Sequence, residues 1–154
     1  FGSRGGGWEQ VNSELAFERS GPERFLSSFR LLAAEIGAIG EGRLPARTDL
    51  GRSVARMAGL HALSQNIAGA LQRGEPADIP AALVKLLGTT TEGDIVDVVS
   101  TRLGDEFSPG EGESASAELV HLLRAGLHQR PGFTLRGGTN EILRGVIARG
   151  LGMR

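Results

Sequence analysis

The chain has 154 residues, enough for one domain and too few for two large ones. Its 17 Lys and Arg residues nearly balance 18 Asp and Glu residues, so the formal net charge of −1 gives no basic field for binding nucleic acid or a membrane surface. The absence of cysteine excludes disulfides, thiolate metal sites and a thiol nucleophile. With no signal peptide or long apolar segment in view, we expect a cytoplasmic protein.

The first third of the chain has the apolar spacing of helices. A helix is expected from Trp8 to Arg19, and Gly21-Pro22 then interrupts the pattern. Glycines and Pro45 end the next helix, and a loop follows to about Asp49. Spacings of three and four residues predict that this next helix buries one apolar face, formed by Phe25, Phe29, Leu32, Ile36 and Ile39.

Two further helices are expected in the middle of the chain. Asp49 can cap one of them, whose apolar stripe runs from Val54 to Leu71. The other starts at Asp78, with a proline in its first turn, and runs to Leu103. Glycines inside the second segment leave it open whether this segment is one helix or two.

The last third begins with an acidic stretch rich in Gly, Ser and Pro, residues 104–116, which we expect to be exposed and mobile. A helix over Leu119–Leu127 should end at Pro131-Gly132. Residues 133–136 are a possible short strand, and a last helix should begin near Thr139.

Long helical segments joined by short loops predict an all-α fold, an antiparallel four-helix bundle with an additional short C-terminal helix. The spacing of the three histidines, His61, His121 and His128, forces no metal site, because the helix that carries two of them offers too few carboxylates. No metal is therefore expected, and composition and spacing alone leave the function open.

Three segments resemble one protein family. Residues 132–154, GFTLRGGTNEILRGVIARGLGMR, resemble the C-terminal end of flavin-dependent acyl-CoA dehydrogenases, which commonly carry a GGTNEI/L-R segment there. GWEQVNSELAFER, residues 7–19, is similar to the start of the family's first C-terminal helix, and AALVKLLGTTTEGDIVD, residues 81–97, is similar to another of its helices. The resemblance implies that residues 8–154 are the family's C-terminal helical domain and that residues 1–7 are a remnant loop from a preceding β-domain.

The resemblance also implies a reaction. Such enzymes use FAD to introduce an α,β double bond into an acyl-CoA thioester, as in fatty acid β-oxidation, with a carboxylate that removes the α-proton. Many members carry this glutamate immediately before the G-T of the tail, where this chain has Gly137. Isovaleryl and long-chain types carry it instead in the first helix, at the position of Glu18, so the resemblance implies that Glu18 is the catalytic base. Glu23, the rival carboxylate, is expected to pair with Arg19 one helical turn away.

Other site residues follow from the same resemblance. Arg19, Gly137 and Gly138 would bind the substrate, with the Gly137 N–H polarising the thioester oxygen. The family's contacts to FAD fall on Thr139 and Glu141, and Arg47 would reach the flavin phosphate across a dimer. Thr139 and Glu141 are equally well explained as a helix cap and as a carboxylate that favours the helix dipole. This chain departs from the family in lacking the Q-x-x-G-G-x-G flavin loop, in place of which it has residues 104–116.

Two function classes remain beside the enzyme. A non-catalytic acyl-CoA dehydrogenase-like subunit of a heteromeric complex would account for the altered flavin loop, and an unrelated helical interaction module would account for the helices alone. For the enzyme we expect an acyl-CoA substrate, a homo- or hetero-oligomer of such subunits, and an electron acceptor flavoprotein. The 154 residues by themselves are expected to be inactive, because half of a flavin site offers half of the contacts.

Overall fold

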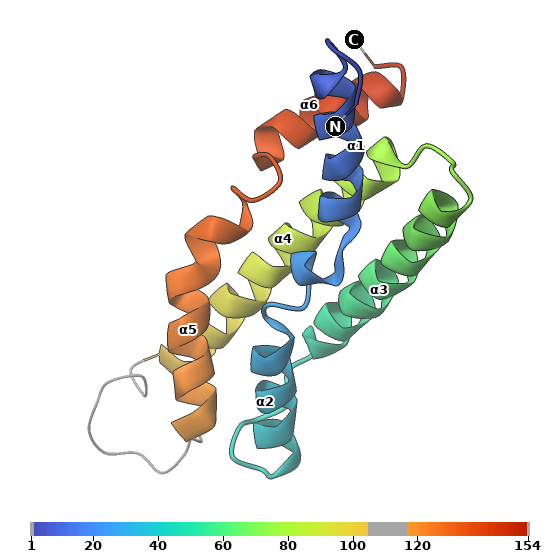
Figure 1. The fold of residues 1–154 in the computed structure, drawn as a ribbon. Helices are drawn as coiled ribbons and strands as arrows, with labels where there is room; N and C mark the ends of the chain where they lie inside the picture. Colours follow the sequence, from blue (N-terminus) through green and yellow to red (C-terminus); the bar gives the residue numbers. More distant parts are fainter. Residues whose placement is uncertain (1, 105–116, 154) are drawn as a thin grey trace.

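The computed structural model describes residues 2–104 and 117–153. Helix α4 lies at the centre of the structure and contacts all the other helices (Figure 1). The N-terminus of α1 and the end of α6 lie at the same end of the molecule (Figure 1). The elements in chain order are α1 (Gly7–Ser20), the 3₁₀ helix η1 (Pro22–Arg24), α2 (Phe29–Gly40), α3 (Leu50–Gln72), α4 (Asp78–Leu103), α5 (Ala117–Phe133) and α6 (Asn140–Gly150).

The structure confirms an all-helical fold over the residues that it describes, and it contains no strand there. The finer arrangement, an antiparallel four-helix bundle, stays a prediction. The segment from Asp78 to Leu103 forms one continuous helix, which resolves the alternative left open by its glycines. One of these, Gly88, packs so closely on η1 that a Cβ atom there would lie 2.3 Å from the Arg24 carbonyl oxygen. Glycine at this position therefore lets η1 approach α4.

The predicted apolar face of the second helix is wrong in two of its members. Phe25 and Leu32 are buried, but Phe29 is 50% exposed and Ile36 is 41% exposed. Phe25 precedes α2, so it does not share the register of the helix. The buried face of α2 consists of Leu31, Leu32, Glu35 and Ala38. Glu35 belongs to that face because two arginines pair with it inside the protein.

Three expectations for other segments are also corrected or refined. Helix α5 continues through Pro131 to Phe133, because a proline in the last turn removes one backbone donor without stopping the helix. Phe133 ends that helix and residues 134–137 form turns, so the possible strand over 133–136 does not form. Asp49 takes the N-cap position of α3 without a side-chain cap hydrogen bond. Apart from Gly104, the acidic stretch lies outside the described residues.

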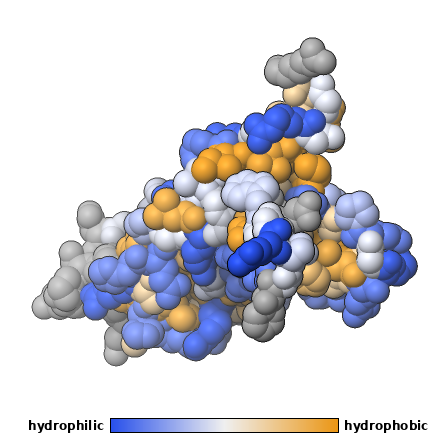
Figure 2. All heavy atoms as spheres, turned by 45° about the horizontal axis from the view of Figure 1, so that its top comes forward, coloured by the Kyte–Doolittle hydropathy of each residue, from blue (hydrophilic) through white to orange (hydrophobic). Residues whose placement is uncertain are grey.

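The described surface carries several large apolar side chains. Trp8 is 76% exposed on α1, and Val11 and Phe17 on the same helix are also exposed. Figure 2 shows apolar residues gathered in patches on the face that it presents. Among the described helices, none combines the length and apolar character needed to cross a bilayer.

Candidate functional site

The site predicted from the sequence is assembled where the end of α1 meets the turn between α5 and α6. We call it the Glu18–Gly137 cluster; its members are Glu18, Arg19, Arg24, Gly137 and Gly138. The two segments are more than a hundred residues apart in sequence, yet Arg19 Nε donates a hydrogen bond of 2.9 Å to the carbonyl oxygen of Gly137. Helix α4 supports both segments, since it contacts α1 and α6.

The Glu18 carboxylate is half exposed to solvent and is bound by Arg24. Its side chain is 48% exposed, whereas Arg24, its partner, is 3% exposed. Arg24 Nη2 donates to Glu18 Oε1, and Arg24 Nε donates to the Glu18 carbonyl oxygen at 2.9 Å. A buried arginine that grips both the main chain and the carboxylate fixes the rotamer of the glutamate. The carboxylate is thus oriented and still reachable.

Gly137 and Gly138 form the opposite side of the cluster. Their φ angles of +68° and +101° lie in the region that L side chains rarely adopt. A Cβ atom at Gly137 would lie 3.5 Å from Glu18 Oε1 and 3.5 Å from Arg24 Nη2. The two positions between which the family distributes its catalytic glutamate are therefore in contact in this chain. The bare backbone also lets a ligand approach closely.

Arg19 joins the two sides of the cluster. Besides its bond to Gly137, its Nη2 atom would lie 3.6 Å from a Cβ atom at Gly138. Burial lowers the pKa of Arg19 from its usual value, the nearby carboxylates of Glu18 and Asp78 raise it, and Arg24 lowers it further. An arginine remains charged under these influences, so Arg19 places a fixed positive charge beside the glycine turn.

Thr139 and Glu141 lie directly after the glycine turn, at the start of α6. Thr139 is the N-cap, and its hydroxyl oxygen accepts a hydrogen bond of 3.4 Å from the Ile142 N–H. A hydrogen bond to its own backbone, one to Thr139, and more weakly Arg144 and Lys85, lower the pKa of Glu141. These contacts support the capping roles of both residues and do not test a contact with flavin.

Arg47 does not join the cluster. Its Nε atom donates to Glu35 Oε1 at 2.9 Å, and its Nη1 atom lies 2.8 Å from Asp49 Oδ1. Burial alone would lower the pKa of Arg47, but hydrogen bonds to Glu35 and Asp49 outweigh it and raise the pKa. Arg102 also pairs with the fully buried Glu35, at 3.2 Å. These contacts support a structural role for Arg47.

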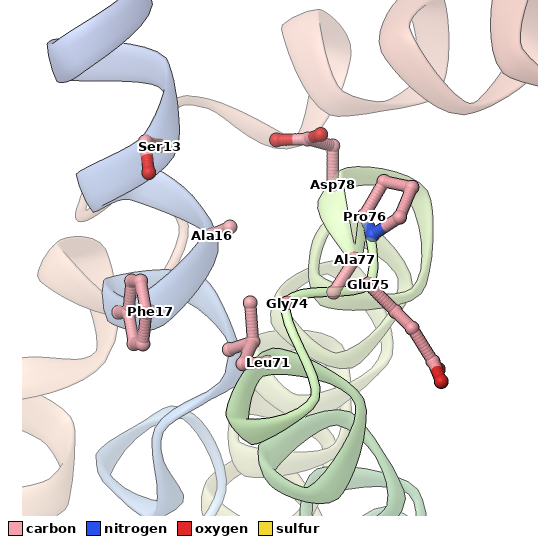
Figure 3. A pocket seen from close by; sticks show the side chains of 9 residues that line it. All are labelled: Ser13, Ala16, Phe17, Leu71, Gly74, Glu75, Pro76, Ala77 and Asp78. Atoms are coloured by element: carbon pink, nitrogen blue, oxygen red, sulfur yellow. The ribbon is translucent and has the colours of Figure 1, made fainter.

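A half-open pocket of about 540 Å³ lies between α1 and the turn that joins α3 to α4. Figure 3 shows α1 as one wall and the turn between α3 and α4 as the other, with the Glu75 carboxylate directed away from α1. The lining is mainly apolar and consists of Ser13, Ala16, Phe17, Leu71, Gly74, Glu75, Pro76, Ala77 and Asp78. Local sequence does not predict this pocket, because its walls come from separate helices.

Sequence reasoning also missed the residues that hold the cluster. Arg24 was overlooked beside Glu23, which lies 3.8 Å from Arg24 instead of forming the expected pair with Arg19. Lys85 is fully buried in α4 and donates to residues on both sides of the glycine turn. Its signal in the sequence is a single lysine inside the apolar run AALVKLL.

Within residues 2–104 and 117–153, no group of three or more histidine or acidic side chains is arranged to hold a metal ion. A comparison of the chain with models of known protein families finds no match. A comparison with curated proteins also finds none. The case for a function is therefore made from the cluster itself and from the motifs that compose it.

Proposed function

We propose that this chain is the C-terminal helical part of an FAD-dependent acyl-CoA dehydrogenase, with Glu18 as the base that removes the α-proton of an acyl-CoA thioester. The observation that carries the proposal is the contact between Glu18 and Gly137. A catalytic carboxylate has two alternative positions in the family that the motifs resemble. In this chain one position holds glutamate, the other holds glycine, and 3.5 Å separates Glu18 Oε1 from the place of the missing side chain.

A single carboxylate suits this site. Two glutamates at these positions would repel each other, and one would hold a proton at neutral pH. With glycine at 137, the Glu18 carboxylate lies beside the positively charged side chains of Arg24 and Arg19. A half-exposed carboxylate that is held in one orientation has the properties of a general base.

The glycine turn would bind the thioester. The hydrogen bonds that fix this turn use the Gly137 carbonyl and the Arg19 side chain, and the Gly137 N–H is not among them within the described residues. A free N–H beside the base is what a thioester carbonyl needs, since a hydrogen bond to its oxygen acidifies the α-proton. Arg19 would hold the turn, and Gly138 would give the ligand room.

The residues also fit a flavin at the start of α6. Consecutive glycines at positive φ present bare backbone, and Thr139 and Glu141 follow them at the N-terminus of α6, where Glu141 is exposed. When bound, FAD would supply the acceptor for the β-hydride. We do not include Arg47 in this site, because Glu35, Asp49 and Ser53 engage its side chain. The exposed apolar residues of α1 favour a further domain or subunit against that helix, in a homo- or hetero-oligomer that passes electrons to an acceptor flavoprotein.

The test is the rate at which acyl-CoA bleaches the flavin of the longer protein that contains this chain. In Glu18→Gln, which keeps the shape and the hydrogen bond from Arg24, we expect reduction to slow at least about a hundredfold with acyl-CoA binding retained. Glu23→Gln is the matched control and should leave the rate unchanged. Equal, measurable rates in Glu18→Gln and wild type would remove Glu18 from the mechanism, whereas a wild type without acyl-CoA-dependent flavin reduction would favour the non-catalytic subunit.

A further inference from the structure

Lys85 is the only lysine of the chain, and it lies fully buried in the first third of α4. Its Nζ atom donates to the Thr134 carbonyl oxygen at 3.1 Å and to Asn140 Oδ1 at 3.0 Å. Thr89, one turn further along α4, lies 3.3 Å from the same Asn140 oxygen. One ammonium group therefore joins the residue directly after α5 to the first residue of α6.

These two acceptors stand on either side of the glycine turn. Thr134 precedes Gly137 by three residues, and Asn140 follows it by three. A second contact comes from Glu92, about two turns after Lys85 on the same side of α4. Its Oε2 atom lies 3.9 Å from Arg136 Nη2, immediately before the turn. Helix α4 thus holds the two ends of the turn through Lys85, and burial raises the pKa of the neighbouring Glu92 carboxyl.

Burying an ammonium group carries a desolvation penalty that an apolar side chain of the same size does not. Burial and the charges of Arg24 and Arg19 lower the pKa of Lys85 to about 8; Glu141 on α6 raises it, and Arg136 lowers it slightly. Methionine would fill a similar volume without this cost, as apolar replacements of buried charges often show. What lysine adds at this position is the pair of hydrogen bonds to the two sides of the turn.

We propose that Lys85 is a positioning residue that fixes the Gly137–Gly138 turn against Glu18 by bridging Thr134 and Asn140. The consequence for catalysis rests on the proposed function, whereas the effect on the turn does not. Without the bridge, the Gly137 N–H and the Glu18 carboxylate lose their fixed separation. Small displacements of this kind reduce rates strongly, because the reacting groups must be held in line.

Amide hydrogen exchange over residues 135–143 of the full chain tests the bridge directly. Lys85→Met and Asn140→Leu should each speed exchange in this segment at least about tenfold, since each loses charge-assisted hydrogen bonds. Asn140→Asp keeps an acceptor for the ammonium and should retain protection. Leu60→Ala, a core truncation in α3, is the control for general loss of stability and should leave the ratio of exchange in 135–143 to that in α4 unchanged.

A Lys85→Met protein whose turn exchanges as in wild type, or only as much as in Leu60→Ala, would overturn the proposal. In the longer enzyme the same variant should slow flavin reduction at least about tenfold with acyl-CoA affinity within about threefold, because positioning acts on the reaction step. An unchanged reduction rate would overturn the catalytic consequence. A wild-type enzyme without any acyl-CoA-dependent flavin reduction would defeat the proposed function, while the exchange data would still decide the role of Lys85.

Discussion

Glu35 and Glu18 are both bound by arginine, and they differ in what the protein leaves free. Glu35 is fully buried between Arg47 and Arg102, so its partners enclose it. Glu18 is 48% exposed, while the arginine that holds it is buried. The first arrangement stabilises the junction of α2, α4 and the loop between α2 and α3. The second orients a carboxylate and keeps it accessible, and this difference separates a structural ion pair from one suited to proton transfer.

Neutralising Glu35 should have the largest effect on stability. Glu35→Gln leaves Arg47 and Arg102 without their shared anion, and breaking such a buried pair lowers the free energy of unfolding by about 3–5 kcal/mol. Chemical denaturation of the purified chain measures this loss. Glu18→Gln should cost clearly less, because its side chain faces solvent and the Arg24 bond to the main chain remains. Equal losses for the two variants would contradict the contrast.

Gly88→Ala should disturb the ion pair between Arg24 and Glu18, because Gly88 packs against Arg24. The added Cβ atom would meet the Arg24 carbonyl oxygen at 2.3 Å, so η1 must move and Arg24 with it. Overpacking of this kind costs about 1–3 kcal/mol in the free energy of unfolding. Gly59→Ala on α3 is the matched control: no atom lies within 4 Å of its Cβ position, and alanine there should stabilise the helix by about 1 kcal/mol. Thermal or chemical unfolding of the two variants measures these changes in the free energy of unfolding. A Gly88→Ala variant as stable as wild type would contradict the close packing of η1 on α4.

The pH dependence of stability should report the buried Lys85. The folded pKa is about 8, below the ordinary value of 10.5, so between these pH values the unfolded chain holds a proton that the folded chain has released. The free energy of unfolding should therefore rise as the pH increases from about 8 toward 10.5. The sequence has no cysteine or tyrosine to titrate in that range. Lys85→Met should abolish the rise, and a rise that persists in this variant would assign it to another group.

Much of the fold is predictable from apolar spacing, and the exception in α2 has a specific physical cause. Helix α3 buries Met57, Leu60 and Ile67 of its expected stripe, but Val54, at the start of that stripe, is 43% exposed. In α2 the pattern selects Phe29 and Ile36, although the buried face includes Glu35. Spacing rules treat a charged residue as exposed, so a helix whose buried face contains an ion pair is assigned the wrong face. The partners of Glu35 on the loop after α2 and on α4 cannot be seen from local sequence.

The candidate site shows the same limit. Glu18, Arg19 and Gly137 were identified through motifs at opposite ends of the chain, and the structure places them in contact. Arg24 and Lys85 hold these residues. Arg24 lies outside the two motifs, and Lys85 lies inside the apolar run AALVKLL. Their roles depend on hydrogen bonds to distant backbone atoms, such as the Thr134 carbonyl, that only the folded chain brings near. Arg47 shows the opposite error: the resemblance assigned it to the flavin phosphate, whereas in the structure it pairs with Glu35 and Asp49.

The most direct test of the account moves the carboxylate across the 3.5 Å contact. In the acyl-CoA dehydrogenase of which we propose this chain is a part, Glu18→Gly should slow flavin reduction by acyl-CoA at least about a hundredfold. Adding Gly137→Glu should recover part of that rate, because the new side chain starts where Glu18 ends; recovery should be incomplete, since glutamate is strained at φ +68°. A double variant that reduces its flavin faster than Glu18→Gly supports one shared proton-transfer site. A double variant no faster than Glu18→Gly, with acyl-CoA still bound, would contradict it.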